Sequence, residues 1–305
     1  MRRPFRLPTL TVAVLVVAVL PGCSVRKLAV NSLGNALAEG GTTFASDDDP
    51  ELVRDAAPFS LKTIEALLEE SPRHRGLLLA AASGFCRYAF AFVQQEADFV
   101  EGRDLNRATE LRERAVKLYL RGRGYGLRGI ELDFPGFTER LRKDAKGALA
   151  PLRPRDVPFL YWTAAAWGGA MALRKSDSSL TADQDLAEAL MQRALELDEG
   201  FELGSIHDFF ISYEAGRASV GGSLERAREH YTRALVLAKG QRLWPYLNLA
   251  ESASVAAQDR KEFEDLLSQA LELDPDRAPD QRLSNIVAQR RARWLLSRAD
   301  ELFVE

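Results

Sequence analysis

The residues that could do chemistry in this sequence are few and far apart. Its histidines and cysteines are His74, His207, His230, Cys23 and Cys86. No histidine has a partner at metal-ligand spacing, so we predict neither a metal nor a cofactor. Asp208 directly follows His207 and makes the best acid–base candidate, but we interpret His207 as a structural residue hydrogen-bonded inside a stack of helices. Since the sequence has no GxSxG, HExxH or GxxxxGK[ST] motif, we expect no enzyme; a hydrolase centred on His207 and Asp208 is the alternative.

Cys23 lies in a context that predicts lipid modification. Positive residues at positions 2, 3 and 6 precede an apolar run, Leu10 to Leu20, that is too short for a transmembrane helix of about 20 residues. The run ends in Leu20-Pro21-Gly22-Cys23, which resembles a bacterial lipobox. We therefore predict a lipoprotein signal peptide at residues 1–22 and a diacylglycerol-linked Cys23, with an ordinary secretory signal as the alternative. Acyl chains would hold the protein at a membrane in the periplasm, and Ser24 favours the outer membrane.

Cys86 and the overall charge exclude further classes of function. Cys86 stands among Phe85, Tyr88 and Phe90, which predicts a small buried hydrophobe and not a reactive thiol. The chain has 41 Lys and Arg residues against 44 Asp and Glu, and 46% of it is hydrophobic, as in an ordinary globular protein. A net charge of −3 does not provide the positive face that phosphate contacts need, so we expect no nucleic-acid partner.

The elements that must position these residues are all predicted to be helices. No segment alternates apolar and polar residues between hairpin turns, so the sequence predicts an all-α fold, with residues 23–305 as a single domain. Asp49-Pro50-Glu51 marks one helix start, with a capping Asp, Pro at the first position and an acid in the first turn. The predicted helices are 26–39, 50–70, 74–100, 104–121, 136–149, 157–174, 182–197, 203–218, 223–238, 243–257, 260–273 and 280–303.

Three segments repeat one pattern: a small or apolar residue, a bulky residue four positions later and alanine three further on. They are Ala187/Met191/Ala194, Ala227/Tyr231/Ala234 and Phe263/Leu267/Ala270. Their final alanines are 40 and 36 residues apart, slightly more than the ~34 residues of a tetratricopeptide (TPR) unit. The pattern predicts TPR-like antiparallel helix-pair repeats stacked as an α-solenoid, a superhelical array in which small residues allow close helix contacts. A plain helical bundle is the alternative.

Aromatic residues recur at helical spacing and make the best candidate binding surface. In TPR arrays the first helix of each pair lines the concave face, so some aromatic side chains are predicted to face a groove. The candidate ligand- or partner-lining residues are Tyr88, Phe92, Tyr161, Trp162, His207, Tyr246 and Asn248. Tyr and Trp carry polar tips that require partners when buried, which favours these positions. Packing in the core is the alternative for each of them.

The last predicted helix, residues 280–303, is rich in arginine opposite an apolar face. Its polar side carries Gln289, Arg290, Arg291, Arg293 and Arg298. We expect this helix to cap the array with a polar outer side, as the terminal repeat of a solenoid must. As an alternative, the arginines and Trp294 would anchor a partner or a second protomer.

Several separated blocks together resemble one known family. They are Tyr88–Val93, residues 118–128 (LYLRGRGYGLR), Val157–Trp167, residues 189–210 (ALMQRALELDEGFELGSIHDFF) and Asn285–Leu296. Over nearly all of residues 23–305 the sequence is similar to the T component of TRAP-transporter-associated TPR lipoproteins. Gly124 departs from this resemblance, and we expect it to loosen its helix, since glycine in mid-helix costs about 1 kcal/mol relative to alanine.

The resemblance implies a periplasmic, lipid-anchored helical adaptor without enzymatic activity. Members of the family are thought to bind a TRAP-type periplasmic solute-binding protein and to assemble as homo-oligomers, expected to be trimers. Their proposed role is to help deliver a small hydrophobic ligand towards the transporter. These expectations come from the resemblance alone. A structural TPR lipoprotein that scaffolds cell-envelope or outer-membrane assembly is the alternative function.

Overall fold

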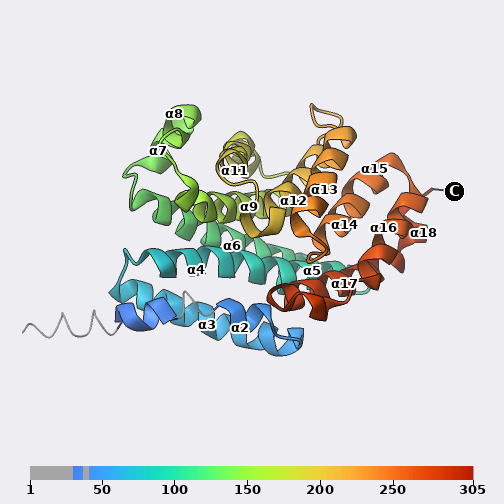
Figure 1. The fold of residues 1–305 in the computed structure, drawn as a ribbon, viewed down its shortest axis with the longest axis horizontal. Helices are drawn as coiled ribbons and strands as arrows, with labels where there is room; N and C mark the ends of the chain where they lie inside the picture. Colours follow the sequence, from blue (N-terminus) through green and yellow to red (C-terminus); the bar gives the residue numbers. More distant parts are fainter. Residues whose placement is uncertain (1–29, 37–40, 305) are drawn as a thin grey trace, which may run out of the picture.

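The computed structural model describes residues 30–36 and 41–304, and the regular elements in these ranges are helices (Figure 1). No strand occurs in this part of the chain, which confirms the all-α prediction. The signal peptide predicted at residues 1–22 and the lipid site predicted at Cys23 lie outside the described residues.

The first layer of the molecule is formed by residues 30–36 and the helices α2 (Gly41–Ala45) and α3 (Pro50–Glu70) (Figure 1). α3 begins as predicted, because the backbone N–H of Leu52 donates to the Asp49 carboxylate at 3.0 Å and Pro50 takes the first helical position. The buried face of α3 packs on the next helix of the chain.

One long helix runs through the centre of the molecule (Figure 1). It consists of α4 (Arg75–Tyr88), the π-helical η1 (Ala89–Gln94) and α5 (Gln95–Glu101), which follow one another without a break. α4 packs against α3 and against the helices α6 (Leu105–Glu131) and α9 (Val157–Leu173). By length and composition the central helix could cross a membrane, but half of its most apolar window is buried inside the protein, as in a core helix.

α6 extends well beyond the predicted helix 104–121, because its glycines do not end it. The helix is unbroken at Gly124, and the expectation that this residue loosens it stays a prediction. Gly126 and Gly129 lie so close to α9 that a Cβ would come within 2.1 Å and 1.9 Å of its side-chain atoms. These two glycines therefore allow the close approach of α6 and α9, whereas Gly124 has open space around its Cα.

Two short helices, α7 (Phe137–Lys143) and α8 (Ala145–Leu149), replace the single predicted helix 136–149. Asp144 separates them, because its carboxylate accepts the backbone N–H of Gly147 at 3.0 Å and so starts a new helix. α8 also packs against a helix that follows α9 in the chain.

From residue 154 onward the described chain is a succession of helices joined by short turns. Besides α9, the elements are η2 (Pro154–Asp156), α10 (Ser178–Thr181), α11 (Gln184–Leu197), α12 (Phe201–Gly216), α13 (Leu224–Ala238), α14 (Trp244–Leu249), the π-helical η3 (Ala250–Ser254), α15 (Val255–Ala257), α16 (Arg260–Glu272), η4 (Pro275–Arg277), η5 (Pro279–Gln281), α17 (Arg282–Leu296) and α18 (Ala299–Leu302). The predicted boundaries lie within a few residues of these, except that the predicted helix 280–303 is divided into α17 and α18.

Buried hydrophobic side chains form two cores. The first extends from Leu61 in α3 to Phe210 in α12, and the second from Ile211 in α12 to Phe303. We call the elements from residue 30 to α11 the N-terminal lobe and those from α12 to α18 the C-terminal lobe. Phe90 of η1 packs against both cores, so the central helix joins the two lobes.

The residues of the repeated pattern lie at helix contacts in α11, α13 and α16. Eight of the nine are buried and Tyr231 is half-buried. Helices also contact one another in chain order, α12 with α13 and α16 with α17, as stacked helix pairs do. The assignment of these pairs as TPR-like repeats stays a prediction.

The last long helix, α17, returns to the N-terminal lobe. It packs against α2 and α3, and Arg291 pairs with Asp98 of α5 at 3.0 Å (Figure 1). Next to this pair, Trp294 meets Phe99 of α5 with ring centroids 5.4 Å apart. We call these interactions the closing contacts. Arg291 is only 11% exposed, so the expectation that the arginines of this helix form a polar outer side is wrong for Arg291.

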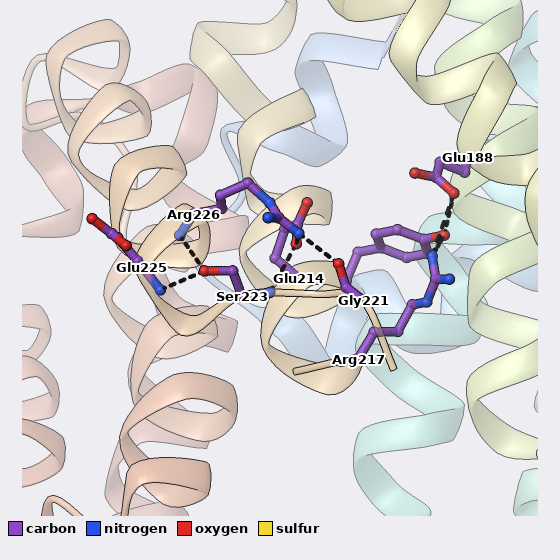
Figure 2. A network of polar contacts seen from close by, with 8 residues as sticks. Glu188, Glu214, Arg217, Gly221, Ser223, Glu225 and Arg226 are labelled. Carbon is purple, nitrogen blue, oxygen red and sulfur yellow. Dashed lines mark hydrogen bonds and ion pairs between the residues drawn. The ribbon is translucent and has the colours of Figure 1, made fainter. Parts of the chain in front are cut away.

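The turn between α12 and α13 is held by a network of polar contacts (Figure 2). Ser223 caps α13 by accepting hydrogen bonds from the backbone N–H groups of Glu225 and Arg226 at 3.1 and 3.2 Å. Glu214, near the end of α12, accepts the backbone N–H of Ser223 at 3.0 Å and pairs with Arg226 at 2.7 Å. The network therefore fixes the two helices of this pair relative to each other.

Candidate functional site

The two lobes meet at a cluster of aromatic and charged side chains around η1. Phe90 packs against Trp244 of α14 with ring centroids 4.8 Å apart. Arg87, near the end of α4, lies over the ring of Trp162 at 4.6 Å and pairs with Glu202 of α12 at 2.7 Å. π-Helical segments often occur at functional sites, and η1 contributes Phe90 to this cluster. We call the cluster the lobe junction; its members are Arg87, Phe90, Tyr161, Trp162, Phe201, Glu202, Asp208, Arg242 and Trp244.

Two of the predicted lining residues, Tyr161 and Trp162, belong to the lobe junction. Their rings meet edge to face with centroids 4.8 Å apart, and Tyr161 also contacts Phe201 of α12 at 5.1 Å. Burial raises the pKa of Tyr161 above its usual value, and the carboxylates of Glu202 and Asp208 act in the same direction. The Tyr161 hydroxyl therefore stays protonated and can donate a hydrogen bond at the junction.

α12 enters the junction through a left-handed turn. Glu202, Leu203 and Gly204 have φ angles of 43°, 58° and 84°. For residues other than glycine this conformation costs about 1–3 kcal/mol each, so the surrounding contacts must hold it. Arg87, in the N-terminal lobe, pairs with Glu202. Arg242, in the C-terminal lobe, donates a hydrogen bond of 3.4 Å to the carbonyl oxygen of Leu203. Both lobes thus maintain the turn.

A buried ion pair, Arg242 with Asp208, lies beneath this turn. The two side chains are 7% and 11% exposed. Burial opposes the charge of Arg242, but Asp208 raises its pKa, so the guanidinium stays charged. Asp208 Oδ1 has no hydrogen-bond partner in the described part of the chain. Because a buried pair of this kind contributes little to stability, its effect here is to position the start of α12.

His207 does not act together with Asp208. Its Nδ1 is 2.8 Å from Nδ1 of His230, and its Nε2 is 3.2 Å from the Glu199 carboxylate. Asp208 instead pairs with Arg242. Burial lowers the pKa of His207, which favours its neutral form. The acid–base pair considered from the sequence is therefore not assembled in this structure.

The remaining predicted lining residues lie elsewhere. Tyr88 and Phe92 pack together on the central helix with ring centroids 5.8 Å apart. Tyr246 meets Tyr231 edge to face at 5.8 Å, and Asn248 is half-buried on α14. The structure thus brings Tyr161 to Trp162 and Tyr88 to Phe92 but does not gather all of the predicted residues. Their contact with a ligand or partner stays a prediction.

Two hollows open at the surface away from the lobe junction. One, of about 330 Å³, is lined by Pro72, Leu127, Arg128, Glu131, Leu132 and Thr138. The other, of about 360 Å³ on α16, is lined by Asp259, Lys261, Glu262, Asp265, Leu266 and Gln269. None of the predicted lining residues borders either hollow. Neither hollow is therefore assigned to a ligand here.

Sequence reasoning missed the charged residues of the junction, Arg87, Glu202 and Arg242. Arg87 and Glu202 are 115 positions apart, so no local pattern could indicate their contact. The sequence does contain one local signal for the turn that carries Glu202, which is Gly204. This glycine has a φ of 84°, a conformation that glycine adopts readily. A glycine after an acidic and an apolar residue at the start of a helix could have suggested such a turn.

Cys86 is buried, as predicted. It is 5% exposed in the first core, and burial raises the pKa of its thiol to about 12. The thiol therefore stays protonated and unreactive in the folded chain. In the part of the chain that the structure describes, His, Cys, Asp and Glu side chains do not gather into a group of three that could hold a metal ion.

The helical elements and their two cores define an all-α protein. This chain belongs to the TRAP transporter T-component family, whose model matches residues 46–303 and so takes in both lobes. A protein of Treponema pallidum (strain Nichols), described as an uncharacterized protein, is 32% identical, covering 93% of this chain and 94% of its own length. The match confirms the resemblance seen in the sequence and supports a role associated with TRAP transport.

Proposed function

We propose that this protein is a lipid-anchored periplasmic adaptor that binds a TRAP-type solute-binding protein and assists the uptake of its ligand by a TRAP transporter. The observation that carries the proposal is the family match over residues 46–303, which spans both lobes and the whole junction between them. The proposal includes anchoring through Cys23, stacking of the helix pairs as TPR-like repeats and assembly into a homo-oligomer, expected to be a trimer.

The lobe junction supports a docking role. Arg87 is 54% exposed and Glu202 34%, while Tyr161 and Phe201 are half-buried, so the junction presents charge and aromatic surface together. Aromatic residues and arginine are enriched at protein interfaces. A partner seated here would touch both lobes at once, and a small hydrophobic ligand would meet Tyr161 and Trp162.

The partner is tested with the unlipidated chain, residues 24–305, as bait in a periplasmic extract, followed by mass spectrometry of the retained proteins. We expect retention of a TRAP-type solute-binding protein. Retention of outer-membrane assembly proteins in its place would contradict the adaptor role and support the envelope scaffold. Sedimentation of the same chain tests the oligomer, for which a trimeric mass is expected and a monomer would contradict it.

The docking surface is tested with one charge reversal and a matched control. Arg87→Glu repels Glu202 at the junction, and we expect at least about a tenfold loss of solute-binding-protein affinity. Arg107→Glu changes a side chain of similar exposure, 55%, that pairs with Glu110 on α6, and we expect little loss. Equal losses in both variants would show that the partner does not dock at the junction.

Anchoring is tested separately in cells. Cys23→Ala removes the thiol that the lipid would occupy, so we expect the protein to move from the membrane to the soluble periplasmic fraction. A variant that stays with membranes as strongly as the wild type would contradict lipid anchoring.

A further inference from the structure

One end of the molecule combines exposed cations with proximity to residue 30. Residues 71–75 and 127–156, which include α7 and α8, lie with residues 30–36 at the end of the long axis opposite the C-terminus (Figure 1). We call these three segments the basic end. Residues 30–36 are fixed there, because Ser71 Oγ donates to Asn31 Oδ1 at 2.8 Å and His74 Nε2 lies 3.4 Å from the Asn31 carbonyl oxygen.

The carboxylates within residues 127–156 of the basic end each have an ion-pair or hydrogen-bond partner. Residues 127–156 contain five acidic residues. Asp133 and Asp156 both pair with Arg75 at 2.9 Å, and Glu139 pairs with Lys143 at 2.7 Å. The other two bind backbone N–H groups: Glu131 those of Gly136 and Thr138, and Asp144 that of Gly147. Glu131 and Asp144 keep their charge, so residues 127–156 are basic only by the excess of seven basic over five acidic residues.

Five exposed cations of the basic end have no carboxylate within ion-pair distance among the described residues. They are Arg73, Arg128, Arg140, Lys146 and Arg153. Residues 127–156 hold seven basic residues, although the chain as a whole is acidic. Residues 259–280 of the C-terminal lobe show the opposite balance, with eight acidic and three basic residues. These two segments therefore carry charge of opposite sign.

The basic end also has an exposed apolar side chain and lies a short stretch of chain away from Cys23. Leu33, on the helical segment 30–36, is 50% exposed. Only residues 24–29 separate this segment from Cys23, and such a connection spans at most about 25 Å. Cations interspersed with an exposed apolar residue are typical of protein surfaces that rest on a bilayer with anionic lipids.

We propose that the basic end is a membrane-contact surface, whose five cations without a carboxylate partner bind the phosphate groups of anionic lipids. The inference rests on the proposed lipid anchor, because the anchor is what brings this end to a bilayer. Contact here leaves the lobe junction and the acidic segment 259–280 turned away from the lipid. The acyl chains and the basic end then act as two attachments, which together also set the orientation of the molecule.

The test uses the unlipidated chain, residues 24–305, which keeps every described residue, in co-sedimentation with lipid vesicles. We expect binding to vesicles of phosphatidylethanolamine with phosphatidylglycerol, weakening as salt is added, and little binding to vesicles of phosphatidylcholine. No binding to the anionic vesicles, or equal binding to both kinds, would overturn the inference.

Two triple variants with the same change in charge locate the surface. Arg73→Gln, Lys146→Gln and Arg153→Gln together remove three free cations of the basic end. Each basic residue near an anionic surface contributes roughly a fivefold factor, so vesicle binding should fall on the order of 100-fold. The control combines Lys239→Gln, Arg277→Gln and Arg293→Gln, exposed side chains in the C-terminal lobe, and should bind nearly as the wild type. Equal losses would show attraction by net charge alone and overturn the proposal.

A probe of position separates the membrane from other occupants. A fluorophore attached at Leu33→Cys should respond to anionic vesicles, while one at Val236→Cys, an exposed position on α13, should not. If the basic-end variant keeps vesicle binding but loses the solute-binding protein, the surface binds an acidic protein and the membrane inference is wrong. Because these vesicle assays use no lipidated protein, failure of the Cys23→Ala test would concern the anchor alone.

Discussion

Long helices that carry glycine build the N-terminal lobe, whereas the C-terminal lobe consists of shorter helices with alanine at their contacts. The central helix and α6 are each 27 residues long, and Gly126 and Gly129 of α6 touch α9. In the C-terminal lobe no helix exceeds 16 residues within the described chain, and Ala227, Ala234 and Ala270 are fully buried. Buried alanines such as Ala81 and Ala115 pack the N-terminal lobe as well, so the difference lies in the glycine contacts between its long helices.

This difference bears on how far the stability of each lobe depends on its contacts with the other lobe. A lobe held by glycine contacts between long helices tolerates no added atom at those contacts but depends little on its neighbour. The C-terminal lobe has shorter helices and charged links, among them Arg291 with Asp98 and Glu251 at 3.0 and 2.6 Å. We therefore expect the C-terminal lobe to depend on the N-terminal lobe more than the reverse.

The largest effect is expected from cutting the closing contacts. Arg291→Ala leaves two largely buried carboxylates without this partner and should lower the free energy of unfolding by about 3 kcal/mol. In urea, circular dichroism should show an early loss of helix while Cys86, in the first core, stays protected from alkylation. Arg290→Ala is the control, because its exposed pair with Glu51 contributes about 0–1 kcal/mol. A single shared transition would mean that the lobes are not separable.

The glycine contacts of the N-terminal lobe give the next effect. Gly129→Ala places a Cβ 1.9 Å from the buried Phe159 ring and should destabilise the protein by about 2 kcal/mol, as overpacking does. Gly124→Ala adds the same atom where nothing lies within 4 Å, so it should stabilise α6 by about 0.5–1 kcal/mol. Urea titrations of both variants measure the difference, and a shift of the same sign in both would contradict the packing argument.

Acid should weaken the C-terminal lobe by a smaller amount. Burial, followed by the neighbouring His207, lowers the pKa of His230 from 6.5 to about 4. Between these values the unfolded chain binds more protons than the folded one, so stability falls as the pH falls from about 6.5 to about 4. After allowance for partial exposure we expect about 1–2 kcal/mol. His230→Gln should flatten the pH dependence of the midpoint in urea, whereas His74→Gln in the N-terminal lobe should leave it in place.

The smallest effect is expected at Arg87. Arg87→Met keeps the apolar stem but removes the cation over Trp162 and the pair with Glu202, which should cost about 1 kcal/mol. Arg107→Met, which breaks only a pair between exposed side chains on α6, should cost less. The unfolding midpoints of the two variants in urea measure this difference in stability. Equal midpoints would show that the left-handed turn does not depend on Arg87.

The helices of both lobes were largely predictable because their signals are local. Asp49 and Pro50 start α3 as the sequence indicates, and the alanines of the repeated pattern in α13 and α16 are buried. The end of α6 was not predictable by the same rules, because a glycine that breaks an isolated helix is required where two helices touch.

The candidate site was predictable only in its aromatic part. Tyr161 and Trp162 are candidates because Tyr and Trp carry polar tips that require partners when buried. Their partners Arg87, Glu202 and Arg242 depend on contacts between segments that are distant in the sequence. Such contacts follow from the path of the chain and leave no trace in the spacing of residues along one helix.

The closing contacts also determine when the molecule can be completed. Asp98 and Arg291 are separated by 193 positions, so their contact has to wait until nearly the whole chain has been synthesised. The first core is made by residues up to Phe210 and can form while the rest is still emerging. Contacts between such distant segments are slow to form, because a long loop must close first. A chain cut short before α17 would therefore keep its N-terminal lobe and the lobe junction but lack the closing contacts, and the face of α16 that packs on α17 would be open to proteolysis.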